Sequence, residues 1–269
     1  MLRFSVATIC LAVLTGAASA SSITLDFGVN QGFANFGTQG TTADISNVAT
    51  GINARFTSLS GYSQTQTGTD SFGAPKIAAD VRNNDFRIRA DEGETAALRL
   101  QLFDANFGNG FQQLFTSATP FEWSLIFYDL DTKAIPNSFD SVLLKTVGTA
   151  SLSQDTLLIT KQLQDGLLVS AEDMSSGNDA NAGVETLSSE QQRYSVEYTV
   201  QNTSMVEFDY IVGRIGTGNN DRVALIDGGT LTIDDPVTIT VAPIPLPAGV
   251  FLLLGGLGAL SVARRAFRS

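Results

Sequence analysis

Apolar and polar residues alternate with a period of two along many segments of the chain. The alternation is clear at residues 52–57, 98–102, 121–127, 194–200 and 206–212. Successive side chains of a β-strand point to opposite faces, so this pattern indicates half-buried antiparallel strands. Clusters of Gly, Asn and Asp, which favour turns, separate the segments. About ten to twelve strands are expected, the first at residues 22–27 and the last at residues 229–234. The predicted fold is all-β: an antiparallel two-sheet sandwich of the jelly-roll type.

Residues 1–20 have the layout of a secretory signal peptide. A short basic start precedes an apolar stretch at residues 4–14 that is too short to span a bilayer. Ala18 and Ala20 supply small side chains at the cleavage positions, so the mature chain is expected to begin at Ser21. The single cysteine, Cys10, would leave with this peptide. The mature chain then has no thiol for disulfides, metal sites or nucleophilic catalysis.

The C-terminal end combines an apolar run with a basic tail. Residues 248–263 are 16 residues without a charge. As a helix they reach about 24 Å, short of a hydrocarbon core of about 30 Å, and snorkelling arginines or a locally thinner bilayer would make up the difference. The basic tail, residues 264–269, contains Arg264, Arg265 and Arg268. By the positive-inside rule these arginines stay in the cytoplasm, so the run is expected to be a transmembrane helix with the rest of the mature chain outside.

A short motif precedes this run and consists of Ile244, Pro245, Leu246, Pro247 and Ala248. Motif, apolar run and basic tail, in this order over residues 242–269, resemble the VPLPA-CTERM signal. This signal is a variant of the PEP-CTERM sorting class and usually has valine where this chain has Ile244. The resemblance implies export by a Gram-negative bacterium, retention in the inner membrane, and processing by an exosortase, a membrane transpeptidase that cuts near the motif. It also implies a destination at the cell surface or in the extracellular matrix, in company with exopolysaccharide. The prolines keep the motif extended, which is the conformation that a protease can bind.

The domain between the two ends, residues 21–241, is strongly acidic. It holds all 27 acidic residues but only 12 of the 16 basic ones, a net charge of −15. Such a charge repels nucleic acid and anionic lipid, so no nucleic-acid partner is expected. The chain has no histidine, which excludes Ser-His-Asp triads and histidine metal sites. We therefore expect a non-enzymatic exported protein of the cell envelope or extracellular matrix. The alternatives are a carbohydrate-binding module for exopolysaccharide and a glycoside hydrolase.

Three aspartates form a candidate calcium site. Asp129 and Asp131 follow a strongly alternating strand, and Asp140 comes after a turn. Calcium takes about six to eight oxygen ligands, and strand-end loops of β-sandwiches can supply them. Lys133 stands where an EF-hand loop needs its third ligand, so the EF-hand spacing fails. The alternative is that these aspartates are turn residues that accept hydrogen bonds from local backbone donors.

Residues 206–214 carry a candidate hydrolase motif. Glu207 and Asp209 resemble part of the E-x-D-x-x-E signature of laminarinase-like glycoside hydrolases, which are themselves jelly rolls. Val212 stands where the signature has its acid/base carboxylate. A retaining hydrolase needs two carboxyl groups, one to attack and one to protonate the leaving oxygen. Strand alternation alone also places Glu207 and Asp209 together on one solvent face.

A carbohydrate site is expected to use exposed aromatic side chains with neighbouring polar groups. Trp123 is the only tryptophan and shares the apolar face of its strand, so we expect it in the core. Tyr62 and Tyr128 are the candidates for exposed stacking residues.

Overall fold

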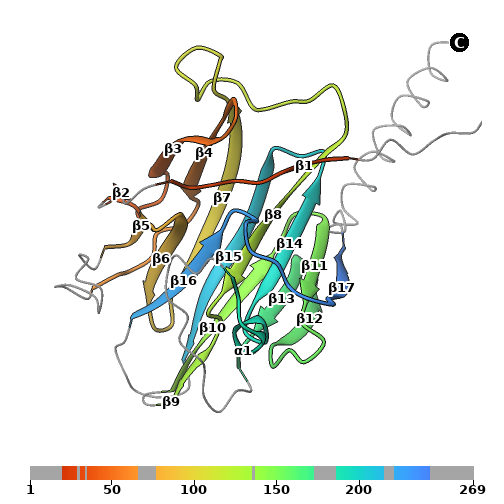
Figure 1. Cartoon of the computed structure of the whole chain (residues 1–269). Coiled ribbons are helices and arrows are strands. Elements are labelled where there is room, and N and C mark those ends of the chain that lie inside the picture. Colours follow the sequence, from red (N-terminus) through yellow and green to blue (C-terminus); the bar gives the residue numbers. More distant parts are fainter. Residues whose placement is uncertain are drawn as a thin grey trace, which may run out of the picture.

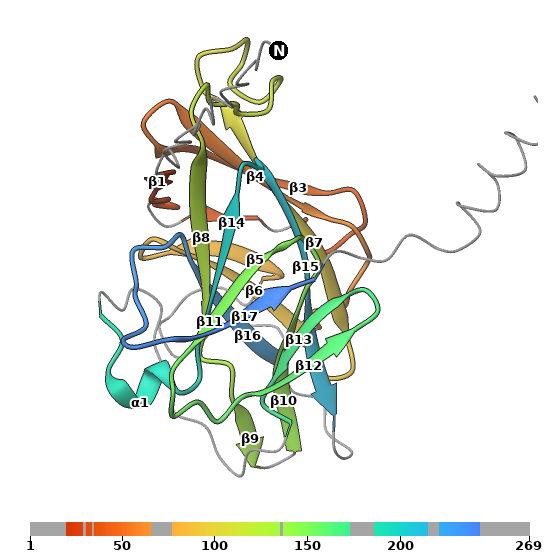
Figure 2. The same ribbon diagram turned by 90° about the vertical axis from the view of Figure 1, so that its right-hand side faces the viewer.

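The computed structural model describes residues 20–28, 31–33, 35–65, 77–134, 137–172, 186–214 and 221–242. These residues form two β-sheets that pack face to face, together with one short helix (Figures 1 and 2). The prediction of an all-β, two-sheet sandwich is confirmed, and the jelly-roll subtype stays a prediction.

One sheet has nine strands in the order β17-β11-β14-β8-β16-β6-β5-β2, with β1 paired to β8. Its strands are β1 (Ser21–Ile23), β2 (Gln31–Gly32), β5 (Ala79–Arg82), β6 (Asp85–Asp91), β8 (Phe121–Tyr128), β11 (Gly148–Leu152), β14 (Val196–Gln201), β16 (Asp221–Asp227) and β17 (Val237–Val241).

The other sheet has eight strands in the order β12-β13-β10-β15-β7-β4-β3, with β9 paired to β10. Its strands are β3 (Thr42–Ala49), β4 (Ile52–Ser58), β7 (Thr95–Asp104), β9 (Thr132–Ala134), β10 (Asn137–Leu144), β12 (Ile159–Leu163), β13 (Gly166–Ser170) and β15 (Met205–Arg214).

The described strand pairs are antiparallel with one exception, at β8. This strand has β14 along one side, while its other side is shared by two partners. β1 pairs with residues 121–123 in parallel, and β16 pairs with residues 126–128 in the antiparallel sense. β1 therefore pairs with the part of β8 that β16 leaves unpaired on that side. The first described strand is thus held in its sheet beside a central strand.

The core lies between the sheets and follows the alternation in the sequence. Phe56 of β4 stacks on Phe86 of β6 at 3.7 Å between ring centroids, and Phe127 of β8 meets Phe208 of β15 edge-on at 4.9 Å. Each pair joins one sheet to the other. Strands β4, β7, β8, β14 and β15 lie at the five alternating segments named above, so these predictions are confirmed.

Two local predictions are wrong. The residues that the structure describes form seventeen strands, β1 to β17, because several strands of two to five residues are too short to show a clear alternation. The last of them is β17, not residues 229–234, where the described chain bends without forming a strand. The described residues also form one short helix, α1 (Ser189–Gln192), which begins with a capping box on Ser188.

Candidate functional site

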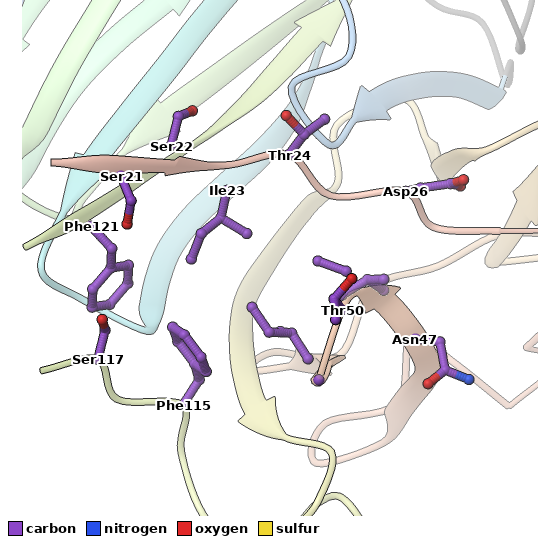
Figure 3. A pocket seen from close by; sticks show the side chains of 14 residues that line it. Ser21, Ser22, Ile23, Thr24, Asp26, Asn47, Thr50, Phe115, Ser117 and Phe121 are labelled. Atoms are coloured by element: carbon purple, nitrogen blue, oxygen red, sulfur yellow. The ribbon is translucent and has the colours of Figure 1, made fainter. Parts of the chain in front are cut away.

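A groove of about 850 Å³ opens at one end of the sandwich, where β1, the β3–β4 turn and the segment before β8 come together (Figure 3). Its lining is Ser21, Ser22, Ile23, Thr24, Asp26, Asn47, Val48, Ala49, Thr50, Gly51, Ile52, Phe115, Ser117 and Phe121.

The lining combines an apolar surface with many hydroxyl and amide groups. Phe115 and Phe121 meet edge-on, with ring centroids 5.3 Å apart, and together with Ile23 they form the apolar side. Thr50 and Asn47 are exposed at the β3–β4 side of the groove (Figure 3). Binding sites for small molecules commonly pair an apolar surface with a few placed polar groups. The groove is therefore suited to a ligand that has both apolar faces and hydroxyl groups.

A buried asparagine fixes the β3–β4 hairpin, which forms one side of the groove. Asn53 of β4 accepts a hydrogen bond from the Asn47 backbone N–H at 2.8 Å and donates one to the Gly110 carbonyl at 2.9 Å. Asn47 lies in an irregular stretch of β3, where the pairing with β4 shifts register, and its φ is 58°. Such bulges redirect side chains, and asparagine tolerates this left-handed backbone better than most residues. The β3–β4 turn is thereby fixed against the 105–114 segment before any ligand binds.

A second feature is a buried ion-pair network that joins the two sheets. Arg222 of β16 contacts the carboxylates of Asp131 and Asp140 through Nη2, and its Nε lies 3.1 Å from Asp140 Oδ2. The Tyr210 hydroxyl of β15 donates to Asp140 Oδ1 at 2.6 Å. Burial raises the pKa of Asp140 well above its ordinary value, while the Tyr210 hydrogen bond lowers it. The guanidinium contacts favour the charged carboxylate at neutral pH.

The structure places the three calcium candidates near one arginine. Asp131 and Asp140 both bind Arg222. Asp129, whose charge also acts on Asp140 and Arg222, adopts a φ of 61°, a conformation typical of turns. Among the side chains that the structure describes, no group of three His, Cys, Asp or Glu residues is placed to hold a metal ion. Calcium binding stays a prediction, and Arg222 occupies the place between two of its proposed ligands.

The hydrolase candidates lie where alternation puts them, on one face of β15. Glu207 binds Arg99 of β7, with Arg99 Nη2 to Glu207 Oε1 at 2.6 Å, and Asp209 binds Lys145 at 2.6 Å. Burial raises the pKa of Asp209, and the hydrogen bond from Lys145 opposes this rise. Each carboxylate therefore pairs with a cation, Glu207 with Arg99 of β7 and Asp209 with Lys145, which directly follows β10.

The three aromatic candidates for a carbohydrate site differ in how deeply they are buried. Trp123 is 1% exposed and its Nε1 donates to the Thr203 carbonyl at 2.7 Å, so its placement in the core is confirmed. Tyr128 is 0% exposed and donates to Asp85, so its prediction as an exposed residue is wrong. It is covered because the chain packs Leu187 and Leu231 over the outer side of its sheet. Tyr62 is half-buried against the core, and its hydroxyl donates to the Ala78 carbonyl at 3.2 Å.

Of the sorting residues, Ala20 and Ser21 fall within the described part of the chain. Ser21 begins β1, and its backbone N–H donates to the Pro120 carbonyl at 2.9 Å. Ala18, residues 244–248 and the arginines at 264, 265 and 268 lie outside the described residues. Within the described ranges, none of the helices has both the length and the apolar character that a membrane span requires.

Comparisons with known proteins place the chain in no family. No family model matches it, and no curated protein matches it. Two solved structures are similar in part, both of the adhesin domain of PrgB from Enterococcus faecalis. One has 11% identity and a TM-score of 0.37, and the match covers 67% of this chain and 57% of that chain. The other shows the domain bound to DNA. It has 13% identity and a TM-score of 0.39, and the match covers 68% of this chain and 62% of that chain. The matches thus span less than two thirds of the PrgB chains, and such distant similarity carries no inference about function.

Proposed function

We propose that this chain is an exported, non-enzymatic protein of the cell envelope or extracellular matrix, with a jelly-roll-type sandwich as its exported domain. Residues 248–263 hold it in the inner membrane, and an exosortase-type transpeptidase processes it near residues 244–248. The observation that carries the proposal is the order of motif, apolar run and arginines at residues 244–268.

The core supports a single folded domain between the two ends, because side chains of both described sheets pack into one apolar cluster. The carboxylates of the candidate hydrolase motif, Glu207 and Asp209, are both engaged in ion pairs. This pairing supports a structural role for that motif.

Cell fractionation of the full chain and of a truncation after Val241 tests the membrane claim. The full chain is expected in the membrane fraction and the truncated chain in the soluble exported fraction. A truncated chain that stays equally membrane-bound would contradict the anchor. Deletion of the sorting protease is expected to accumulate a larger species, and an unchanged mass would contradict the processing.

The groove favours a second candidate function, carbohydrate binding. Sugars present apolar ring faces and many hydroxyl groups, and the groove offers Phe115 and Phe121 beside the polar side chains of Thr50 and Asn47. This surface takes the place of the tyrosines that the sequence suggested. The ligand class that we infer is a neutral or cationic exopolysaccharide, because the domain carries a net charge of −15.

The test is binding of the host's own exopolysaccharide by the full chain and by two groove variants. Asn47→Gly removes the amide but tolerates the φ of 58°, and Thr50→Ala removes an exposed hydroxyl. Both variants are expected to weaken binding several-fold, whereas Thr42→Ala, an exposed change elsewhere on β3, is expected to leave it unchanged. Equal binding by all four chains would exclude the groove.

A further inference from the structure

Strand β17 is the last strand of the nine-stranded sheet, and its outer edge has no partner among the described strands. It pairs with β11 on one side, with Val237 opposite Leu152 and Val241 opposite Gly148. Its sequence, VTITV, reads the same in both directions. All five residues are β-branched, which favours extended structure. Val237, at its start, is 50% exposed.

The other terminal strands of the two sheets carry features that discourage edge-to-edge pairing. β2 has two residues, β3 is interrupted by the irregular stretch near Asn47 and carries Asp44, and β12 carries the exposed Lys161. Short strands, bulges and charged side chains are the usual means by which proteins protect sheet edges. β17 has none of these within its five residues. The contrast indicates an edge that is used for pairing.

We propose that β17 pairs with β17 of a second copy of this chain, in an antiparallel arrangement about a two-fold axis at Ile239. A two-fold contact requires a surface that complements itself, and a palindromic strand meets this requirement residue by residue. Val237 of one copy then faces Val241 of the other, Thr238 faces Thr240, and Ile239 faces Ile239. The two nine-stranded sheets would continue into each other through the main-chain hydrogen bonds of this strand pair.

The faces of β17 agree with such a continuous sheet. Val241 is buried and Ile239 packs against the core between the sheets, while Thr238 and Thr240 are exposed on the opposite face. Opposed β-branched residues and threonine pairs stabilise neighbouring antiparallel strands. The valine and isoleucine side chains of two copies would therefore meet on the core side, and the threonines on the solvent side.

The charges near β17 are compatible with this register. Asp234 and Asp235 precede the strand, so in an antiparallel pair they fall at opposite ends. The two Asp235 residues would be about 27 Å apart along the strands, beyond the Debye length of about 8 Å at physiological salt. The net charge of −15 on each domain still repels the other. Association should therefore strengthen as salt concentration rises from low values.

Cysteine crosslinking in the full chain, purified in mild detergent with Cys10→Ser, tests the register. Thr238→Cys and Thr240→Cys are made as separate variants at exposed positions. Directly opposed residues lie within disulfide reach, whereas identical positions in this pairing are diagonal neighbours about 7–8 Å apart. An equal mixture of the two variants is expected to give several-fold more crosslinked dimer than either variant alone. Equal crosslinking of the mixture and the single variants would overturn the proposed register.

Analytical ultracentrifugation of the same chain tests the association itself. We expect a monomer–dimer equilibrium that Thr238→Lys with Thr240→Lys weakens by about tenfold, because each new lysine faces another across the pair. Thr42→Lys with Ser46→Lys adds the same charge to exposed positions on β3 and is expected to leave the equilibrium unchanged. Circular dichroism should show that both variants keep the parent fold. A parent that stays monomeric at all concentrations, or equal weakening by the two variants, would overturn the proposal.

Discussion

Replacement of Arg222 by methionine should destabilise the domain strongly, because it leaves two buried carboxylates without their shared cation. The Arg222 side chain is 12% exposed, and those of Asp131 and Asp140 are 6% and 0% exposed. Removal of one partner from a buried ion pair typically costs about 3–5 kcal/mol. For a domain of this size, about 2–4 °C of melting temperature corresponds to each kcal/mol, so Arg222→Met should lower the midpoint by about 10 °C.

Thermal and urea unfolding of the wild type and Arg222→Met measure this effect. Arg99→Met is the matched control, since the Arg99–Glu207 pair is about one third exposed and should contribute no more than about 1 kcal/mol. Adding Asp140→Asn to Arg222→Met should recover part of the loss, because the neutral amide can be buried at a lower cost. Equal small effects of Arg222→Met and Arg99→Met would refute the reasoning.

The pH dependence of Arg222→Met has a defined sign. Burial raises the pKa of Asp140, and this rise is no longer opposed by a cation in the variant. A carboxyl whose pKa is raised in the folded state stabilises the fold while it is protonated. This contribution to the free energy of unfolding is lost as the pH rises through the folded-state pKa. The stability deficit of Arg222→Met relative to wild type should therefore be largest near neutral pH and should shrink under acidic conditions. A deficit that grows as the pH falls would contradict this assignment.

Three further predictions concern the metal site, the groove and the partners. Calcium should raise the melting temperature no more than sodium chloride at equal ionic strength, because Arg222 already neutralises Asp131 and Asp140. A calcium-specific rise in melting temperature that Asp131→Ala abolishes would contradict this. Asn53→Ala should cost about 1–3 kcal/mol in urea unfolding, because it removes the buried hydrogen bonds to Asn47 and Gly110. A loss below about 0.5 kcal/mol would show that other contacts hold the β3–β4 hairpin in place. The net charge of −15 should prevent a mobility shift of double-stranded DNA at physiological salt, and a shift at micromolar protein would argue for a DNA-binding surface.

Local alternation was sufficient to predict the long strands and the core. Segments such as β8 and β15 have eight and ten residues, and each buries every second side chain against the other sheet. Trp123 could be assigned to the core from its place in this pattern alone. β17 also alternates, but it is five residues long and falls among Asp and Pro residues that favour turns.

The ion-pair network and the groove depend on contacts between distant parts of the chain. The alternation of apolar and polar residues does not show such contacts. Arg222 meets Asp131 and Asp140 across 91 and 82 residues. The sequence identifies the two aspartates as candidate metal ligands but gives no sign of the arginine that binds both of them. Tyr128 was misplaced for a related reason, because segments from elsewhere in the chain cover the outer face of its sheet. The groove likewise joins residues 21–26, 47–52 and 115–121, which only the folded sheets bring together.

The most direct test of the proposed function is the intact mass of the protein recovered from the envelope and the medium of its native host, with both ends assigned by peptide sequencing. The account predicts a mature chain that begins at Ser21 and ends near Ile244 to Ala248, and a larger form with residues 249–269 when the sorting protease is deleted. A recovered chain that retains both residues 1–20 and residues 249–269 in the presence of the protease would contradict it.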